Sequence, residues 1–213
     1  MPAAGTPAAV AGLTPRGQAT RERIVTAAAA LMYRRGVAGT SLDDVRAATD
    51  TSKSQLYHYF TDKSALVGAV IGRQVQQVLQ AQQPELDSID SMAALRRWRD
   101  RIIALNEQTG AAGCPLGRLA SELSNSDPSA RADLVTGFTA WQERLAAGLR
   151  TMHRQGHLDT GPDPLAAGLL AALQGGLLLT QATHSVAPLQ AALDLALDGI
   201  STHVVEAADI NRG

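Results

Sequence analysis

The chain is poor in cysteine and in aromatic residues, and both scarcities narrow the possible classes of protein. Its 213 residues include one cysteine, which excludes a disulfide within the chain and is typical of the reducing cytoplasm. Aromatic residues make up 3% of the chain although hydrophobic residues make up 45%, so the core must consist of aliphatic side chains. The most apolar stretch, residues 165–179, is shorter than the roughly 18–20 residues of a membrane span and contains Gln174. We therefore expect a soluble, cytoplasmic protein that is not attached to a membrane.

Sequence motifs of catalytic and cofactor sites are also lacking. No glycine-rich phosphate loop, nucleophile elbow or carboxylate pair stands out. His153 and His157 have the i, i+4 spacing of two metal ligands on one helix face, but Gly156 is expected to end the helix between them and no third ligand is evident. We therefore predict a protein that is not an enzyme and that holds neither a cofactor nor a metal ion.

Helical periodicity, in contrast, runs through most of the chain. Apolar residues recur every three or four positions, and the alternation with period two that marks β-strands is absent. Helix starts with a capping residue followed by proline occur at Thr14-Pro15, Asp127-Pro128 and Asp163-Pro164. We predict an all-α protein with a disordered tail at residues 1–13, a helix-turn-helix domain at residues 14–82 and a larger helical domain at residues 83–213. A helix that begins at Asp62 is expected to connect the two domains.

Residues 40–63, T-S-L-D-D-V-R-A-A-T-D-T-S-K-S-Q-L-Y-H-Y-F-T-D-K, predict two short helices joined by a tight turn, the helix-turn-helix itself lying at about residues 41–60. Thr40 is expected to cap the first helix, with Asp43 as its capping-box partner. Asp50 tolerates the left-handed conformation that the turn requires, and Ser52 is expected to cap the second helix. Leu56 and Phe60 lie four residues apart and share one buried face.

The opposite face of the second helix carries hydrogen-bonding side chains and no acid, namely Lys53, Ser54, Gln55, Tyr57 and His58. Residues 1–80 contain 9 lysines and arginines against 5 acidic residues, whereas residues 81–213 contain 10 against 15. An exposed polar helix in a basic segment favours a nucleic-acid partner. Arg16, Arg21 and Arg23 could either contact phosphates or form a solvated helix start. The alternative to a DNA partner is an all-α dimeric interaction module whose basic helix-turn-helix binds protein or RNA.

The order T-S-L-D-D-V followed by S-K-S-Q-L-Y-H-Y-F-T-D-K resembles the helix-turn-helix of the TetR family of bacterial transcriptional regulators. At the turn, where family members often have a small residue, glycine and an aliphatic residue, this chain has Thr49, Asp50 and Thr51. The resemblance implies a homodimeric repressor that binds a palindromic DNA operator and is released by a small-molecule effector. It also implies the following DNA contacts: Thr40, Ser52, Lys53, Ser54, Gln55, Tyr57, His58, Tyr59 and Lys63.

A second resemblance lies around the single thiol. The segment A-A-G-C-P-L-G-R-L-A-S-E-L is similar to one found in the regulatory domains of LmrA- and YxaF-like repressors. Cys114 is expected to be a core or pocket-lining side chain, with redox sensing and nucleophilic catalysis as alternatives.

The C-terminal half offers candidates for an effector pocket and for a dimer interface. Trp98, Phe138 and Trp141 either pack in the core or line a cavity, and Gln174 needs a partner because it interrupts an apolar helix. Together with Cys114 they form the predicted effector pocket. The last two helices are too apolar for the surface of a monomer. The predicted interface comprises Leu169, Leu173, Leu189, Leu193, Ala196 and Ile200.

Overall fold

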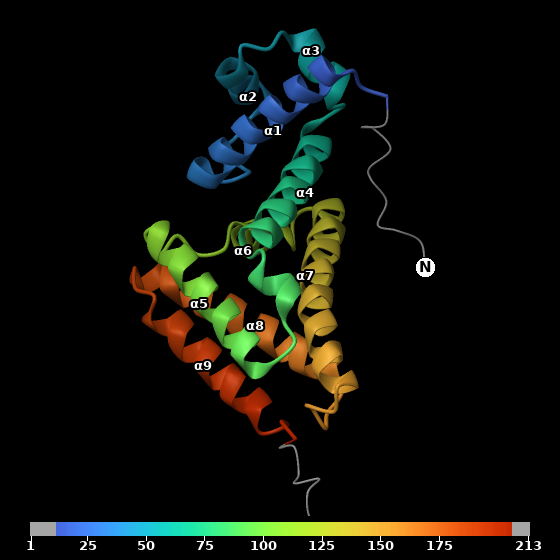
Figure 1. The fold of residues 1–213 in the computed structure, drawn as a ribbon. Coiled ribbons are helices and arrows are strands. Elements are labelled where there is room, and N and C mark those ends of the chain that lie inside the picture. Colours follow the sequence, from blue (N-terminus) through green and yellow to red (C-terminus); the bar gives the residue numbers. More distant parts are fainter. Residues whose placement is uncertain (1–11, 206–213) are drawn as a thin grey trace, which may run out of the picture.

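The structure, a computed structural model, describes residues 12–205 and is built from helices (Figure 1). Its elements are α1 (Pro15–Arg35), α2 (Leu42–Thr49), α3 (Lys53–Tyr59), α4 (Lys63–Ala81), the short 3₁₀ helix η1 (Glu85–Ser88), α5 (Met92–Gln108), α6 (Pro115–Leu123), α7 (Pro128–Arg154), α8 (Pro162–Thr183) and α9 (Ala187–Ser201). Within residues 12–205 the only β-type pairing is an isolated bridge between Leu158 and Val204. The all-α prediction is confirmed, and nearly all of the predicted tail lies outside the described residues.

Capping side chains set most of the helix starts. The Thr14 hydroxyl accepts a hydrogen bond from the Gly17 N–H at 3.2 Å, and the Asp127 carboxylate accepts from the N–H groups of Ser129 and Ala130. The prediction for α8 was wrong by two positions, because Gly161, not Asp163, precedes this helix and Asp163 lies in its first turn. Pro162 accounts for the difference, since its fixed φ favours the first helical position.

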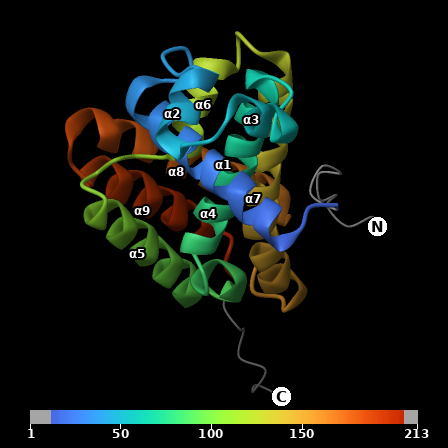
Figure 2. The same ribbon diagram turned by 90° about the horizontal axis from the view of Figure 1, so that it is seen from above.

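Helices α1, α2 and α3 form one end of the molecule, and α4 leads from them into the larger body (Figure 1). Seen from that end, α1 crosses over α4, with α2 and α3 beside it (Figure 2). Ile24 and Leu31 of α1, Val45 of α2 and Leu56 of α3 are buried in a shared core. A small core of this kind holds α3 firmly while leaving its other face exposed.

The larger body is organised around α8, which packs against both α7 and α9. Gly176 permits the contact with α9, because a Cβ at this position would lie 2.9 Å from the Leu189 Cα. Helix α8 has 22 residues and, by length and composition alone, could cross a membrane. The apolar stretch at residues 165–179, which by itself is too short for a membrane span, therefore underestimated the length of this helix. In this fold its buried face belongs to the core formed with α7 and α9.

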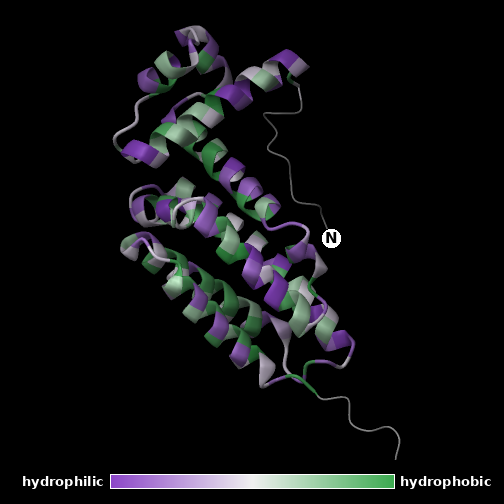
Figure 3. Ribbon diagram, turned by 60° about the vertical axis from the view of Figure 1, so that its left-hand side comes forward, coloured by the Kyte–Doolittle hydropathy of each residue, from purple (hydrophilic) through white to green (hydrophobic). Residues whose placement is uncertain are grey.

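The predicted dimer interface needs a correction at the level of residues. Five of its six members are buried by their own chain, so they cannot contact a partner: Leu169, Leu173, Leu189, Leu193 and Ile200. The sixth, Ala196, is partly buried. The apolar residues that face outward on the same two helices are Leu178, Leu179 and Leu195, which are 66%, 54% and 75% exposed. Green, hydrophobic residues are frequent along the helices near the C-terminal trace in Figure 3.

Candidate nucleic-acid interface and ligand cavity

The first helix of the helix-turn-helix begins one residue later than the sequence predicted. Ser41, not Thr40, is the N-cap of α2, and Asp44 is its capping-box partner. The hydrogen bonds from the Ser41 hydroxyl and backbone N–H lower the pKa of the Asp44 carboxyl. Thr40 is 1% exposed and donates its hydroxyl to the Gly36 carbonyl at 2.9 Å, so no exposed side chain supports its predicted contact with DNA.

The turn between α2 and α3 satisfies its polar groups internally. Asp50 has φ 47° and ψ 43°, the left-handed conformation that was predicted for it. The hydroxyls of Thr49 and Thr51 lie 2.7 Å apart, and the Thr49 hydroxyl also bonds to the Val45 carbonyl at 2.8 Å. The Arg23 guanidinium donates to the Thr49 carbonyl at 2.6 Å. Two buried threonines thus fill the turn through a paired hydroxyl contact.

Helix α3 is held by its apolar face and presents its polar face to solvent. Leu56 and Phe60 are 1% and 2% exposed and belong to the core. The outward-facing side chains are those predicted from the sequence: Lys53, Ser54, Gln55, Tyr57 and His58. The side chains of Ser52 and Gln55 form a reciprocal capping box, in which the Gln55 Oε1 accepts from the Ser52 N–H at 3.2 Å. The Gln55 carbonyl is therefore engaged at the helix start, whereas its exposed NH₂ group can reach outward.

Residues at the end of α3, at the start of α4 and in α1 lie next to the exposed face of α3, and some of them also contact other parts of the fold. Tyr59 is partly buried, with its hydroxyl near Gly17 of α1, and Lys63 is the first residue of α4. Of the three arginines in the first half of α1, Arg23 bonds to the turn, and the Arg21 guanidinium lies 5.3 Å from the centre of the Phe60 ring. Arg16 is exposed at the start of α1. Two of the three arginines thus support the helix-turn-helix itself.

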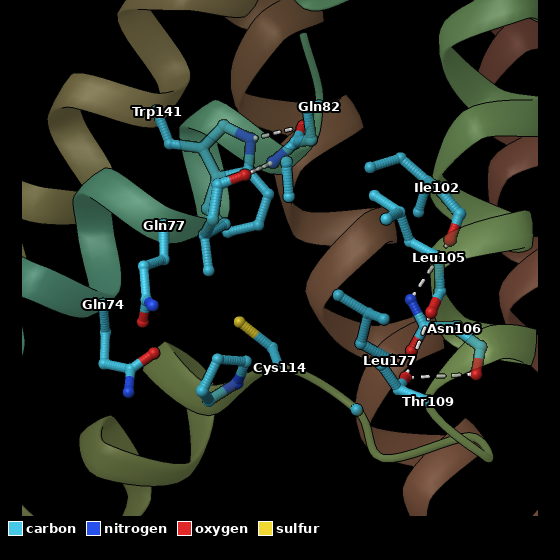
Figure 4. A pocket seen from close by; sticks show the side chains of 14 residues that line it. Gln74, Gln77, Gln82, Ile102, Leu105, Asn106, Thr109, Cys114, Trp141 and Leu177 are labelled. Atoms are coloured by element: carbon cyan, nitrogen blue, oxygen red, sulfur yellow. Dashed lines mark hydrogen bonds between the residues drawn. The ribbon is translucent and has the colours of Figure 1, made fainter. Parts of the chain in front are cut away.

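A cavity of about 280 Å³ lies in the larger body, between the end of α4 and the helices α5, α7 and α8 (Figure 4). Two predicted pocket residues, Cys114 and Trp141, line it. Gln82 crosses one side of the cavity: its Oε1 accepts from the indole N–H groups of Trp98 and Trp141 at 2.9 and 3.2 Å. Its Nε2 donates to the Val78 carbonyl at 2.9 Å. Trp98 is fully buried behind this contact and does not line this cavity, which agrees with the core-packing alternative for this residue.

A second, larger cavity of about 730 Å³ lies between α6, α7 and α8, where Phe138 and Gln174 are found. Cys114 lines this cavity too, so the predicted pocket residues are divided between two spaces with the thiol at the border. The Gln174 Nε2 is buried and has no hydrogen-bond partner among residues 12–205. This cavity adjoins the outward-facing Leu178 of α8.

Cys114 caps α6 and has the environment of a neutral thiol. Its sulfur accepts a hydrogen bond from the Gly117 N–H at 3.4 Å, and the side chain is 8% exposed. Burial raises the pKa of the Cys114 thiol, which favours the unreactive protonated form. These observations agree with the core or pocket-lining role and give no support to a catalytic nucleophile.

Sequence reasoning missed three residues that shape these sites. Gln82 belongs to a run of glutamines at the end of α4, and nothing in that polar run distinguishes the one whose side chain turns inward. Asn106 lines the 280 Å³ cavity from α5, and Glu122 of α6 bonds to the turn after α1. The roles of Gln82 and Glu122 depend on hydrogen-bond partners 16 to 84 residues away, which local periodicity does not reveal.

A short helix with an exposed polar face, set in a small three-helix core beside a larger helical body, defines a helix-turn-helix transcriptional regulator. The sequence agrees with this class. Residues 24–70 match the profile of the bacterial regulatory proteins of the tetR family, and residues 91–194 match that of the LmrA/YxaF-like transcriptional regulator C-terminal domain. This chain belongs to the TetR family, whose members are transcriptional regulators rather than enzymes.

Individual relatives extend the match over most of the chain. An HTH-type transcriptional regulator from the lacX 3′ region of Lactococcus lactis subsp. lactis is 34% identical, over 83% of this chain and 90% of its own length. The HTH-type transcriptional repressor DhaR of Mycobacterium sp. (strain GP1) is 25% identical, over 84% of this chain and 91% of its own. The solved SmeT–triclosan complex is 25% identical, covers 90% of this chain and 94% of its own, and has a TM-score of 0.68.

Proposed function

We propose that this protein is a repressor that binds a palindromic operator as a homodimer and is released from DNA by a small-molecule effector. The observation that carries the proposal is the exposed face of α3, where five hydrogen-bonding side chains project from a helix whose other face is fixed in the core. Lys53 and the Gln55 NH₂ group suit base edges in a major groove, whereas Ser52, Tyr59 and Lys63 suit phosphates. The domain division at residues 82/83 and a cytoplasmic location belong to the same proposal.

The outward faces of α8 and α9 are the surface that we assign to the dimer. Leu178, Leu179 and Leu195 are more than half exposed, and small residues such as Ala171 and Gly175 lie exposed between them on α8. Large apolar side chains on an otherwise small-residue face favour close packing against another helix pair. A two-fold axis through this face would give a dimer with two copies of α3, one for each half-site of a palindrome. The half-sites of such a palindrome lie about 34 Å apart.

The 280 Å³ cavity is the site that we assign to the effector. Gln74, Gln77, Val78 and Ala81 of α4 form part of its wall, and α4 is the helix that connects the cavity to α3. A ligand that favours one position of α4 would therefore alter the spacing of the two recognition helices. The solved complex of the relative SmeT with triclosan supports a small organic molecule in this role.

Selection of bound fragments from random duplex DNA tests the proposal. The full-length chain is incubated with a random library at physiological salt, and the retained fragments are amplified and sequenced. We expect a palindromic consensus with half-sites about one helical turn apart. The matched control is a variant with Lys53, Gln55 and Tyr57 replaced by alanine, which keeps the buried face of α3 and should enrich no consensus. Absence of any consensus with the unchanged protein would refute the proposal.

A further inference from the structure

We propose that the cavity between α4, α5, α7 and α8 takes an uncharged, mainly apolar small molecule that donates a hydrogen bond to Asn106. This inference rests on the proposed function, because it names the chemical class of the effector for the cavity assigned there. Two observations carry it: the composition of the cavity wall, and one buried acceptor atom that the protein leaves without a partner.

The wall of the cavity provides no charge. None of the 14 described residues that line it is acidic or basic (Figure 4). Its apolar part comprises Val78, Ala81, Ile102, Leu105, Pro115, Trp141 and Leu177, and its polar part consists of amides, one hydroxyl and the thiol. A carboxylate or an ammonium group entering this space would lose part of its hydration without gaining a counter-charge. The wall therefore selects for ligands that are neutral.

Cys114 adds to this neutral character. In Figure 4 its sulfur is directed toward the middle of the cavity. Burial favours the protonated thiol, because the pKa of Cys114 is raised above its ordinary value. The sulfur therefore presents a polarisable, uncharged surface, which is suited to contact with an aromatic or aliphatic group.

Asn106 provides the directional contact. The residue is 8% exposed, and its Nδ2 donates to the Ile102 carbonyl at 3.2 Å. Its Oδ1 is buried and has no hydrogen-bond partner among residues 12–205. The other buried amide of the wall, Gln82, has both its Oε1 and its Nε2 engaged within the protein. A ligand hydroxyl or N–H that reaches the Asn106 Oδ1 would supply the missing donor, and a ligand without one would leave the oxygen unpaired.

The size of the cavity limits the ligand further. A volume of about 280 Å³ lies just below the roughly 300–1,000 Å³ that is typical of small-molecule sites. Together with one acceptor and an apolar wall, this volume fits a compact alcohol, phenol or N-heterocycle better than a long or highly polar molecule.

Three probes of similar size separate these features. The full-length protein is titrated by calorimetry with para-ethylphenol, with para-ethyltoluene and with para-ethylbenzoate. The phenol carries the donor, the toluene replaces the hydroxyl by a methyl group, and the benzoate carries a negative charge. We expect the phenol to bind about tenfold more tightly than the toluene, and the benzoate to bind most weakly.

Variants locate the effect at one residue. In Asn106→Leu the ratio of phenol to toluene affinity should fall about tenfold, because both probes then meet an apolar wall. Gln76→Leu is the matched control: it removes an exposed amide of α4 that does not line the cavity and should leave the ratio unchanged. Circular dichroism verifies folding, and Asn106→Ala replaces Asn106→Leu if the leucine does not fit.

Each remaining outcome overturns the inference: tightest binding of the benzoate, an unchanged ratio in the Asn106 variants, or no binding of any probe. None of them affects the selection of operator DNA, so the proposed function would stand. Conversely, if the probes bind as expected and the DNA selection yields no palindrome, the ligand chemistry holds and the proposed function fails.

Discussion

Glu122 accepts a hydrogen bond from the backbone N–H of Ala38, with 2.8 Å between the nitrogen and Oε1, and so joins α6 to the turn between α1 and α2. The same helix contacts α1 a second time, because the Arg118 guanidinium lies 4.8 Å from the centre of the Tyr33 ring. At its other end α6 begins beside Cys114, which lines the ligand cavity. Helix α6 is therefore a second physical connection, besides α4, between the cavity and the DNA-binding end.

The contribution of this hydrogen bond can be measured directly. Glu122→Ala should leave the protein folded and speed the amide hydrogen exchange of Ala38, because its N–H loses a charged acceptor. We expect the free energy of unfolding to fall by roughly 1–2 kcal/mol. Ser121→Ala changes an exposed neighbour on the same helix and serves as the control. Equal exchange rates in the two variants would show that the bond does not hold the turn.

Lys63 tests the assignment of phosphate contacts. The residue occupies the first turn of α4, where a cation opposes the helix dipole, so its position is better explained by an external anion than by helix stability. Lys63→Ala should weaken binding to all duplex sequences alike and lower the slope of log affinity against log salt by about one unit. An unchanged slope in salt titrations would remove Lys63 from the interface.

Gln55 tests base readout without disturbing the helix. Gln55→Glu preserves an acceptor for the Ser52 N–H, so the capping box of α3 and the melting temperature should be retained. The added negative charge should weaken operator binding by about 1–3 kcal/mol and change the preference at one symmetric pair of positions. Binding to a library of operator variants measures both effects. An identical consensus with merely weaker binding would contradict a role in base readout.

Two leucines of α9 distinguish the dimer surface from the core. Leu195→Asp should give a folded monomer in light scattering, because Leu195 is 75% exposed and lies on the face assigned to the partner. Leu193→Asp should instead unfold the protein, since Leu193 is fully buried and a charge there would be unpaired. A folded dimer of Leu195→Asp with full operator affinity would show that the interface lies elsewhere.

The sequence was sufficient for the features that depend on neighbours in the chain. The helices, the left-handed turn at Asp50 and the outward set on α3 all follow from capping residues and from spacing within a few positions. Errors arose where two adjacent residues were chemically equivalent, as with Thr40 and Ser41 at the start of α2. Burial by the whole fold then decided which of them caps and which packs.

The burial of the residues chosen for a dimer interface and a pocket was harder to predict for a different reason. On an apolar helix, periodicity does not tell which face meets its own chain, and the residues chosen on α8 and α9 proved to be the inner ones. Trp98 fits a cavity as well as a core by its size, and only its complete burial among the helices of the larger body places it in the core. Tertiary partners, which no local pattern encodes, settle such cases.

The central claim is that two copies of α3 read two half-sites on one side of a DNA duplex. The most direct test is the affinity of the full-length protein for its selected operator, compared with the same operator after insertion of about 5 bp, half a helical turn, between the half-sites. We expect a loss of affinity of about 100-fold or more, down to the level of a single half-site, because the second recognition helix would then face the wrong side of the duplex. Equal affinity for the two duplexes would contradict it.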